Sequence, residues 1–504
     1  MNGSLEVLNS IRSYAESRQT VGIDDNTLLA FLDTDPTLAE AIADAGRIHD
    51  GLKSEYGDLL SQDEAQVIAE LQTDFINFYP ANTVNPYIAM AAAGPWIITT
   101  HGAVIHDNGG YGMLGSGHSP KHIMEAMGDT HVMANVMTAN FTHKRFSDLL
   151  KKEVGQKRQS CPFERFICMN SGSESVTVAF RIADVNAKNQ TTEGAKHAGK
   201  PIKMLSLEGS FHGRTDRPAQ ASDSCLGKYK QHLASHAAND NLITVVPNDV
   251  EGLRNAFSQA EADGVFIELT LMEPVMGEGD PGLSITREFY DVARELTLAH
   301  GSLFLVDSIQ AGIRGTGYLS IVDYPGFEDA DGPDMETYSK ALNAGQYPLS
   351  VLACNNRASS LYVRGIYGNT MTSNPRALQV GCTVLENLTP TIRQNIQDRG
   401  DEFVNKLNGL MTEFPGLVTK VQGTGLLFSS ELHPEIEVVG FDGIETWLRK
   451  HGLGVIHGGE NSLRFTPHFA ITSQEVDLII DLVRQGIRAF AGRVTGPTAN
   501  MASA

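Results

Sequence analysis

Between about residue 136 and residue 385, short apolar runs alternate with amphipathic helical patterns, and this alternation restricts the possible folds more than any other feature of the chain. The runs include RFICMN, KMLSLEG, GVFIELTLMEP, SLFLVD and LSVLAC. Several are apolar along most of their length, as strands are when helices cover both faces of a parallel sheet. Strands that alternate with helices predict an α/β domain with a mostly parallel sheet sandwiched by helices.

The segments on either side of this region predict further parts of the molecule, as expected for 504 residues. Residues 1–85 have the pattern of a helical N-terminal extension, in which Ser61 and Glu64 show capping-box spacing. We expect residues 86–135 to form a linker and the first part of a small domain, and residues 136–389 to form the large domain. Residues 390–492 complete the small α/β domain, with a second capping-box pattern at Thr472 and Glu475, and residues 493–504 are expected to be a flexible tail.

Charge and composition exclude several classes of partner. The chain carries 60 acidic and 39 basic side chains, a formal net charge of −21, which argues against binding to nucleic acid or to an anionic membrane. No run approaches the roughly 18 apolar residues of a membrane span, and the first residues lack the pattern of a signal peptide. The five cysteines show no CxxC spacing, which favours free thiols in a reducing compartment. These features predict a cytoplasmic protein.

Polar residues follow several of the apolar runs, at the place where open parallel sheets bind ligands. Asp307 ends LFLVD, Lys340 follows METYS, and the NSGSES segment places Gly172 and Ser173 before a predicted helix whose N–H groups could hold a phosphate. Taken alone, the lysine would be a solvated surface charge, and the aspartate an N-cap or a metal ligand. No histidine or acid follows Asp307 at ligand spacing, so we expect no metal. An amine, a carboxylate and a phosphate-binding turn together are the three parts of a pyridoxal phosphate site.

Seven motifs carry a resemblance to a known family: NSGSES, FHGRT, EPVMGEG, VDSIQAGIRGTG, YSKAL, NTMTSNP and LRFTPHF, in this order. The chain from about residue 86 to residue 490 resembles the class III, or omega, aminotransferases of the fold-type I pyridoxal phosphate enzymes. The resemblance is nearest to the branch that acts on lysine, ornithine or 4-aminobutyrate. It implies a large cofactor-binding domain, a smaller α/β domain and a homodimer with a shared active site. Whether such dimers associate into a larger oligomer stays open.

The resemblance also implies roles for individual residues. Lys340 would form the Schiff base with the cofactor and move the substrate proton, and Asp307 would pair with the pyridine nitrogen. Gly172 and Ser173 would bind the cofactor phosphate, and Thr370 would reach the same phosphate from the partner subunit. Phe211 and Ile309 would pack on the two faces of the cofactor ring, and Gln310 would contact the ring hydroxyl.

Three residues match the substrate-binding trio of the lysine, ornithine and 4-aminobutyrate enzymes: Arg214, Glu278 and Arg464. In this scheme Glu278 neutralises one arginine when the amine is bound and moves aside for the second carboxylate of 2-oxoglutarate. A helix cap for Arg214 and a structural salt bridge for Arg464 are the alternatives. Tyr111 lies where ornithine-type enzymes have an aromatic residue in the substrate pocket, although it could equally be a core tyrosine.

The implied activity is transfer of a terminal amino group from a lysine-, ornithine- or 4-aminobutyrate-type donor to 2-oxoglutarate, giving a semialdehyde and glutamate. The same fold and cofactor also serve isomerases such as aminomutases and amino-acid racemases, which would not need Glu278 and Arg464 to switch between an amine donor and 2-oxoglutarate. A catalytically silent cofactor-binding protein is the remote alternative. Two departures from the family pattern, Ser308 in place of glutamate and an inverted Arg314–Gly315 turn, leave the particular amine open.

Overall fold

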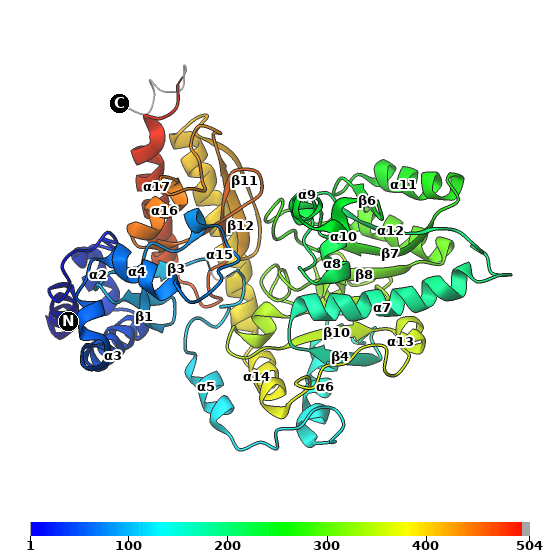
Figure 1. Cartoon of the computed structure of the whole chain (residues 1–504), viewed down its shortest axis with the longest axis horizontal. Coiled ribbons are helices and arrows are strands. Elements are labelled where there is room, and N and C mark those ends of the chain that lie inside the picture. Colours follow the sequence, from blue (N-terminus) through cyan, green and yellow to red (C-terminus); the bar gives the residue numbers. More distant parts are fainter. Residues whose placement is uncertain (1, 110, 239, 496–504) are drawn as a thin grey trace. The chain divides into compact units, whose positions relative to one another are not determined.

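The computed structural model describes residues 2–109, 111–238 and 240–495, so residues 496–504 of the predicted tail lie outside the described residues. The chain divides into two compact units, which we call unit 1 and unit 2 (Figure 1). Unit 1 comprises Met1–Lys121, Asp398–Gln422 and Phe428–Ala504, and unit 2 comprises His122–Gln397 and Gly423–Leu427.

Unit 2 contains a seven-stranded sheet with the order β4-β10-β9-β8-β7-β5-β6. Its strands are β4 (Arg165–Met169), β5 (Ile202–Leu207), β6 (Leu242–Val245), β7 (Phe266–Met272), β8 (Leu303–Asp307), β9 (Met335–Tyr338) and β10 (Ser350–Cys354). The neighbouring pairs from β6 to β9 are parallel, whereas β10 is antiparallel to both β9 and β4. The prediction of a mostly parallel sheet is therefore confirmed, and β10 is the strand that runs against the others.

Helices cover both faces of this sheet. The helices of unit 2 are α6 (Phe141–Glu153), α7 (Gly172–Thr191), α8 (Asp216–Ala221), α9 (Asp223–His232), α10 (Ala234–Ala237), α11 (Val250–Ala262), α12 (Arg287–His300), α13 (Asn356–Leu361) and α14 (Pro375–Glu386), with the 3₁₀ turns η2 (Ile321–Asp323) and η3 (Lys340–Asn343). The connections from β4 to β5 and from β6 to β7 run in opposite directions along the sheet, so right-handed crossovers place α7 on one face and α11 and α12 on the other (Figure 1).

The core of unit 2 forms where α7 packs on the sheet. The apolar residues Val176, Phe180 and Ile182 of α7 are buried against Leu269 of β7 and Leu305 of β8. Burying an apolar side chain of this size contributes about 1.5–3 kcal/mol. The packing of α7 on the sheet therefore fixes the positions of the strand ends from which the loops begin.

Unit 1 contains helices from the N-terminal and C-terminal parts of the chain and two four-stranded sheets. The helices are α1 (Asn2–Arg12), α2 (Asp25–Leu32), α3 (Pro36–Leu60), α4 (Glu64–Gln72), the 3₁₀ turn η1 (Ala81–Thr83), α16 (Ile444–Lys450) and α17 (Ser473–Ala491). One sheet has the order β1 (Ala89–Ala93), β2 (Trp96–Thr99), β3 (Val104–Asp107) and β13 (Leu453–Gly454), and α3 packs on it. The other has the order β11 (Val418–Thr424), β12 (Leu427–Leu432), β15 (Ser462–Phe465) and β14 (Ile456–Gly458).

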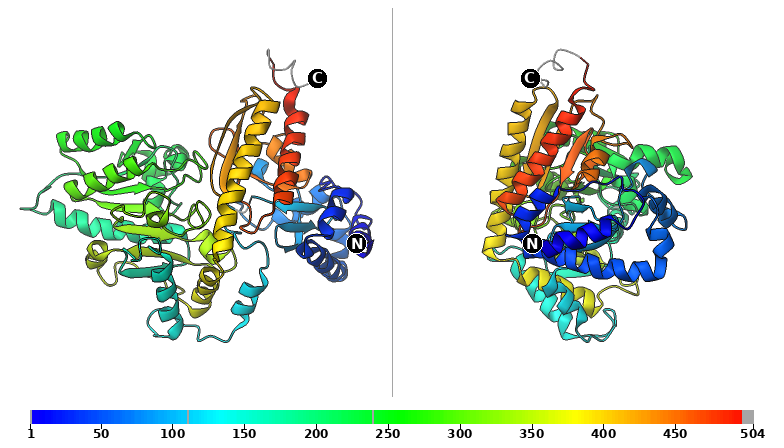
Figure 2. Two further views of the ribbon diagram at one scale, coloured as in Figure 1. Left: turned by 180° about the vertical axis from the view of Figure 1, so that it is seen from behind. Right: turned by 90° about the vertical axis from the view of Figure 1, so that its left-hand side faces the viewer.

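Two helices, α5 (Lys121–Gly128) and α15 (Pro390–Glu413), have residues in both units. Within unit 1, α17 lies beside the C-terminal half of α15, as Figure 2 shows. Ion pairs join the two helices, from Lys406 to Asp477 and from Arg484 to Glu413. The opposite, apolar face of α17 is buried, which makes this helix a main contributor to the core of unit 1.

The two capping boxes expected from the sequence have different outcomes. Thr472 and Glu475 do cap α17, with each side chain bonded to the backbone of the other residue. The box at Ser61 and Glu64 is wrong, because Asp63 is the N-cap of α4 and accepts a hydrogen bond from the Ala65 N–H. The Glu64 carboxylate instead accepts from the backbone N–H groups of residues 19 and 20, which fixes the segment between α1 and α2.

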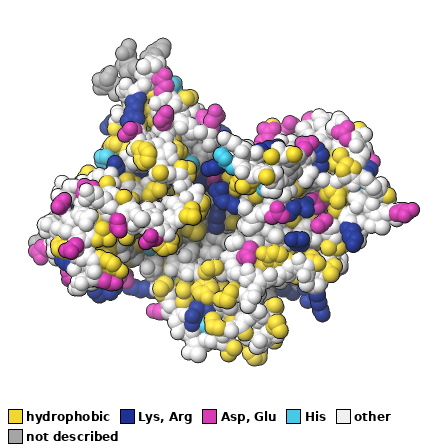
Figure 3. Space-filling model, viewed as in Figure 1, with side chains coloured by type: hydrophobic (Ala, Val, Ile, Leu, Met, Phe, Trp, Pro, Cys, Tyr) yellow, Lys and Arg dark blue, Asp and Glu magenta, His cyan; other side chains and the backbone are white. Residues whose placement is uncertain are grey.

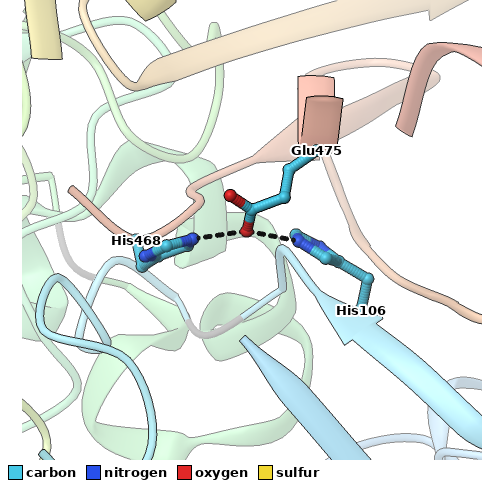
Figure 4. Close-up of side chains that lie close together, drawn as sticks. All are labelled: His106, His468 and Glu475. Carbon is cyan, nitrogen blue, oxygen red and sulfur yellow. Dashed lines mark hydrogen bonds and ion pairs between the residues drawn. The ribbon is translucent and has the colours of Figure 1, made fainter. Parts of the chain in front are cut away.

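The start of α17 is also held by a cluster of the buried His106, the half-buried His468 and the capping Glu475 (Figure 4). Glu475 Oε1 lies 3.0 Å from His106 Nε2 and 2.8 Å from His468 Nε2. These three atoms are close enough to suggest a metal site, but ligand atoms around a tetrahedral zinc lie about 3.3 Å apart because each bond is about 2.0 Å long. The shorter separations are those of hydrogen bonds from two imidazoles to one carboxylate oxygen.

All five cysteines are free, and two of them, Cys354 and Cys382, are buried. Cys168 and Cys354 lie in β4 and β10, as their apolar surroundings predicted. Among the residues that the structure describes, no helix combines the length and apolar character that a membrane span requires.

Candidate active site

A cavity of about 290 Å³ lies in unit 2 among the residues that end or follow β4, β5, β7, β8 and β9. Eight of the twelve residues that the sequence singled out line this cavity: Gly172, Ser173, Phe211, Arg214, Asp307, Ile309, Gln310 and Lys340. Four further lining residues were not predicted: His212, Gly213, Glu273 and Ser339. This cavity therefore lies at the strand ends where the sequence predicted a binding site.

Lys340 follows β9 as the first residue of the 3₁₀ turn η3. Its backbone has a φ of 38°, in the left-handed region that side-chain-bearing residues rarely adopt. Ser339 and Leu342 hold this turn, through Ser339 Oγ bonded to the Leu349 carbonyl and the Leu342 N–H bonded to the Ser339 carbonyl. The Lys340 amine donates a hydrogen bond to Gln310 Oε1. Backbone strain of this kind costs about 1–3 kcal/mol and gathers at functional sites.

Asp307 is the last residue of β8, and its side chain is buried. One carboxylate oxygen lies 2.8 Å from His212 Nδ1, and the other accepts a hydrogen bond from Thr337 Oγ1 at 2.8 Å. A carboxylate oxygen can only accept, so the His212 imidazole carries a proton on Nδ1. Two donors on neighbouring segments thus hold the carboxylate in one orientation.

Glu273 is a second buried acid at the cavity, and no motif pointed to it. Its two oxygens accept from the Phe211 N–H at 3.0 Å and from the Gly277 N–H at 2.9 Å. Burial raises the pKa of Glu273 to about 7, while His212 lowers it and Asp307 raises it. Glu273 therefore fixes the backbone that carries the Phe211 ring.

The phosphate-binding position expected from NSGSES lies at the start of α7. This helix begins at Gly172, and Ser171 caps it in a capping box with Glu174. The Ser173 hydroxyl accepts hydrogen bonds from the N–H groups of Arg214 and Thr215, both at 3.1 Å. The exposed N–H groups of the first helical turn thus lie beside the loop that follows β5, a combination suited to an anion.

Arg214 extends from the same loop. Its Nη1 donates to Tyr229 Oη at 3.3 Å, and its guanidinium carbon lies 5.2 Å from the centre of the Phe211 ring. Burial lowers the pKa of Arg214, but Cys225, Tyr229 and Glu278 raise it, and the net direction is upward. Glu278 therefore acts electrostatically on Arg214, although it is not among the residues that line the cavity.

Thr370 is exposed on unit 2 and does not line the cavity of its own chain. Its carbonyl accepts a hydrogen bond from Asn135 Nδ2 at 3.2 Å, so the segment before α6 lies against it. Arg464 and Tyr111 belong to unit 1, where the Arg464 guanidinium carbon lies 5.7 Å from the centre of the Tyr111 ring. The structure thus brings these last two predicted residues together.

The two departures from the family pattern have different surroundings. Ser308 Oγ donates to Glu336 Oε1 at 2.5 Å, so an acid on the neighbouring strand β9 occupies this region in place of the expected glutamate. Glu336 also accepts hydrogen bonds from the Ile321 N–H at 3.0 Å and from Tyr338 Oη at 2.9 Å. Burial raises the pKa of Glu336 to about 7. Arg314 is buried away from the cavity, with Nη1 bonded to the Leu426 carbonyl at 3.1 Å.

An amine, a buried carboxylate and a helix start that meet at the carboxyl ends of parallel strands define a fold-type I pyridoxal phosphate site. Comparison with known proteins identifies the family. The sequence model described as aminotransferase class-III matches residues 78–487, and the chain belongs to this family. It is a pyridoxal-phosphate-dependent transaminase, as the motifs predicted.

Curated relatives and solved structures agree with this assignment. The chain is 27% identical over 333 residues to the acetylornithine aminotransferase of Nostoc sp., covering 66% of this chain and 73% of that one. It is 26% identical over 411 residues to the ornithine aminotransferase of Staphylococcus epidermidis, covering 79% and 93%. The fold matches the ornithine aminotransferase of Toxoplasma gondii with a TM-score of 0.72, at 20% identity and with 87% and 98% of the chains covered. The acetylornithine aminotransferase of Elizabethkingia anophelis matches with a TM-score of 0.65, at 22% identity and with 85% and 100% covered.

The cavity suits this cofactor. Gln310 Nε2 and His212 Nε2, on two lining residues, are buried and have no hydrogen-bond partner among the described residues. Each can therefore bond to a polar group of a bound molecule. A Cβ at Gly213 would lie 2.3 Å from Ser173 Oγ, and one at Gly172 would lie 2.5 Å from Ile309 Cδ1, so both glycines are needed for the close approach of the three loops.

Proposed function

We propose that this chain transfers the terminal amino group of a lysine-, ornithine- or 4-aminobutyrate-type donor to 2-oxoglutarate. The observation that carries the proposal is the meeting of Lys340, Asp307 and the start of α7 around one cavity. The similarity to ornithine and acetylornithine aminotransferases supports a donor whose reacting amine is distant from its carboxylate. The products would be a semialdehyde and glutamate.

Each cavity residue has a proposed task. Lys340 would hold the cofactor through its amine, and the same amine would take and return the proton of the substrate carbon. Bound pyridoxal phosphate supplies the electron sink for the pair left on that carbon. Asp307, oriented by His212 and Thr337, would pair with the ring nitrogen, and Gln310 Nε2 would donate to the ring oxygen.

The rest of the cavity binds and orients the cofactor. The first N–H groups of α7, at Gly172 and Ser173, bind the phosphate. Phe211 and Ile309 would pack on the two ring faces, and the hydrogen bond from the Phe211 N–H to Glu273 keeps the Phe211 backbone in place. These apolar side chains also exclude water from the reacting carbon.

For the substrates, we propose that Arg214, Glu278 and Arg464 act as a charge gate. Arg214 and Glu278 already influence one another electrostatically in unit 2. A donor with one carboxylate needs one free arginine, whereas 2-oxoglutarate needs two, so a movable Glu278 lets the enzyme accept both. Tyr111, beside Arg464, would line the pocket for the donor chain.

We propose a homodimer in which Thr370 contributes to the site of the partner subunit. Exposed apolar side chains follow Asn135, which is bonded to the Thr370 carbonyl, and follow Thr370 itself, with exposed fractions of 70% for Val136, 90% for Met137 and 61% for Met371. Phe141, at the start of α6, is 92% exposed. Figure 3 shows hydrophobic side chains gathered over α6 and α14, in the lower part of the view. Apolar patches of this kind mark interaction surfaces, and a second copy would cover this one while using Thr370.

We propose a reducing, cytoplasmic location, which the five free thiols support. We also propose that residues 1–85 form an extension, residues 86–135 and 390–492 a small domain, and residues 136–389 the cofactor-binding domain.

The decisive experiment incubates the purified holoenzyme with 2-oxoglutarate and either 4-aminobutyrate, ornithine or lysine, and measures glutamate. We expect glutamate with at least one donor, no glutamate with Lys340→Ala, and wild-type activity with Lys121→Ala, which changes an exposed lysine. Absence of glutamate with every donor would contradict the proposal. Rearranged or racemised donor formed without 2-oxoglutarate would assign the chain to the isomerases instead.

A further inference from the structure

Unit 1 contains a cavity of about 480 Å³ that the N-terminal helices help to build. Ile68 and Leu71 of α4 form one side, together with Tyr79 from the segment that connects α4 to the first sheet. Ile97 of β2 and Ile456 of β14 lie on other sides. The extension is therefore part of a pocket wall, in addition to covering the sheet beneath it.

Tyr111, the residue expected in the donor pocket, also lines this cavity, and its conformation is tightly held. Its backbone has a φ of 49°, which is costly for a tyrosine. The next N–H, of Gly112, is bonded to Thr466 Oγ1 at 3.2 Å, directly after β15. Strain that is maintained by neighbouring hydrogen bonds indicates a ring whose position matters.

Two side chains flank the Tyr111 ring. The Tyr79 ring lies 5.8 Å from it between centroids, at an interplanar angle of 25°, which is a stacked arrangement. The Arg464 guanidinium carbon lies 5.7 Å from the Tyr111 ring centre. Contacts thus run from the extension through Tyr79 and Tyr111 to the arginine that we assign to the substrate carboxylate.

Replacing Tyr79 would change the space available to Tyr111. Without the stacked ring, Tyr111 loses a contact that fixes its plane, and the cavity offers room into which it can turn. A larger ring at position 79 would have the opposite effect. The cavity wall is mixed, because Ile68, Leu71 and Ile97 are aliphatic whereas other lining residues are polar or charged. Its aliphatic part offers favourable contacts to the methylene groups of a longer donor.

We propose that Tyr79 determines which length of aliphatic amine donor this enzyme accepts, by fixing the Tyr111 ring beside Arg464. This inference rests on the proposed function, because it places the donor chain next to Tyr111. Tyr79 acts through Tyr111 and is therefore a positioning residue. The extension would then contribute to substrate selection.

The test measures kcat/KM for 4-aminobutyrate, ornithine and lysine with wild type, Tyr79→Ala, Tyr79→Phe and Tyr79→Trp. In Tyr79→Ala we expect the ratio of kcat/KM for lysine to that for 4-aminobutyrate to rise about tenfold, the effect of roughly one methylene of pocket space. Tyr79→Trp should lower the ratio, and Tyr79→Phe, which keeps the ring, should stay within about twofold of wild type.

Phe75→Ala is the matched control, because Phe75 is in the same segment, is 79% exposed and does not line the cavity. Its selectivity ratio should equal that of wild type. Tyr79 is half-buried, so its variants should fold, and a melting temperature for each one verifies this. An unchanged ratio in both Tyr79→Ala and Tyr79→Trp, or an equal change in Phe75→Ala, would overturn the inference while leaving the transaminase proposal intact. Failure of wild type to use any donor would instead remove the proposed function.

Discussion

His212 Nδ1 lies 2.8 Å from Asp307 Oδ2, and both side chains are almost completely buried. Removing the imidazole would leave Asp307 Oδ2 without this donor, so that only hydrogen bonds to the other oxygen, from Thr337 and from the Ile309 N–H, would orient the buried carboxylate. A hydrogen bond to a charged group contributes about 1.5–3 kcal/mol, so we expect His212→Leu to slow the amine half-reaction about 10- to 100-fold. Rapid-mixing measurements of cofactor absorbance would follow this rate.

His212→Gln is the informative companion, because its amide can still donate to Asp307. It should recover part of the rate, with a melting temperature close to that of His212→Leu. Wild-type rates in His212→Leu would show that the histidine is not needed to orient the aspartate.

The contact between Ser308 and Glu336 leads to a second prediction. Glu336 is fully buried and already accepts hydrogen bonds from Ser308, from the Ile321 N–H and from Tyr338. Ser308→Ala should reduce the free energy of unfolding by about 1–3 kcal/mol, because one donor to a buried acid is lost. Ser308→Glu, which restores the residue typical of the family, should cost more, about 3–5 kcal/mol, because it adds a second acid without a partner.

Denaturant unfolding of the two variants tests this order. The double variant Ser308→Glu with Glu336→Gln contains one buried acid in place of two and should be more stable than Ser308→Glu alone. Ser308→Glu as stable as wild type would mean that the acid on β9 does not replace the missing one.

The site residues that could be predicted from the sequence lie at strand ends, whereas those that could not are recognised only by their hydrogen bonds to distant segments. Lys340, Asp307 and Gly172 end or follow apolar strands, and the carboxyl ends of parallel strands meet at one edge, so their proximity could be predicted. Glu273 and His212 have no such local pattern. Their importance comes from hydrogen bonds to segments more than 60 and 90 residues away, which a single sequence does not reveal.

Strand direction and helix capping show the same limit. The apolar run of β10 was correctly expected to be a strand, but an apolar run has no direction, and the connection from Ser339 to Leu349 is short for a parallel crossover. Ser61 and Glu64 match the capping-box spacing, yet Glu64 bonds to a distant backbone segment. Tertiary contacts decided the outcome in both cases.

Glu475 supports a prediction about pH. Burial raises the pKa of Glu475, but His468 and His106 lower it by more than burial raises it, so the pKa lies far below its usual value. A carboxylate with a lowered folded pKa stabilises the fold above its unfolded pKa of about 4.3, and this contribution is lost as the pH falls. Glu475→Gln should therefore cost about 1–3 kcal/mol at pH 7, and the difference from wild type should shrink below about pH 4.3.

Thr286→Ala provides the control for this measurement. It removes the N-cap hydrogen bond of another helix, from the Phe289 N–H at the start of α12, at a cost of about 1 kcal/mol and without removing a charge. Its effect on the free energy of unfolding should not vary with pH. A pH-independent difference for Glu475→Gln would show that the histidine contacts do not stabilise the charged form.

The shared active site can be tested by mixing two defective variants. Lys340→Ala removes the proposed catalytic amine, and Thr370→Ala removes the proposed contact with the partner's phosphate. If the site is shared, a mixed dimer contains one site with Lys340 from one chain and an intact Thr370 from the other. Random exchange of subunits should then restore roughly a quarter of wild-type activity, because about half of the dimers are mixed and one of their two sites is intact.

The position of Thr370 gives this experiment its physical basis. Thr370 is exposed and lies outside the cavity of its own chain, and its carbonyl is bonded to Asn135, two residues before the exposed Met137. Met137→Asp should prevent dimer formation, measured by light scattering, and should abolish the recovery on mixing. Activity equal to the sum of the two separate variants, measured where light scattering shows mixed dimers, would mean that each subunit uses only its own residues.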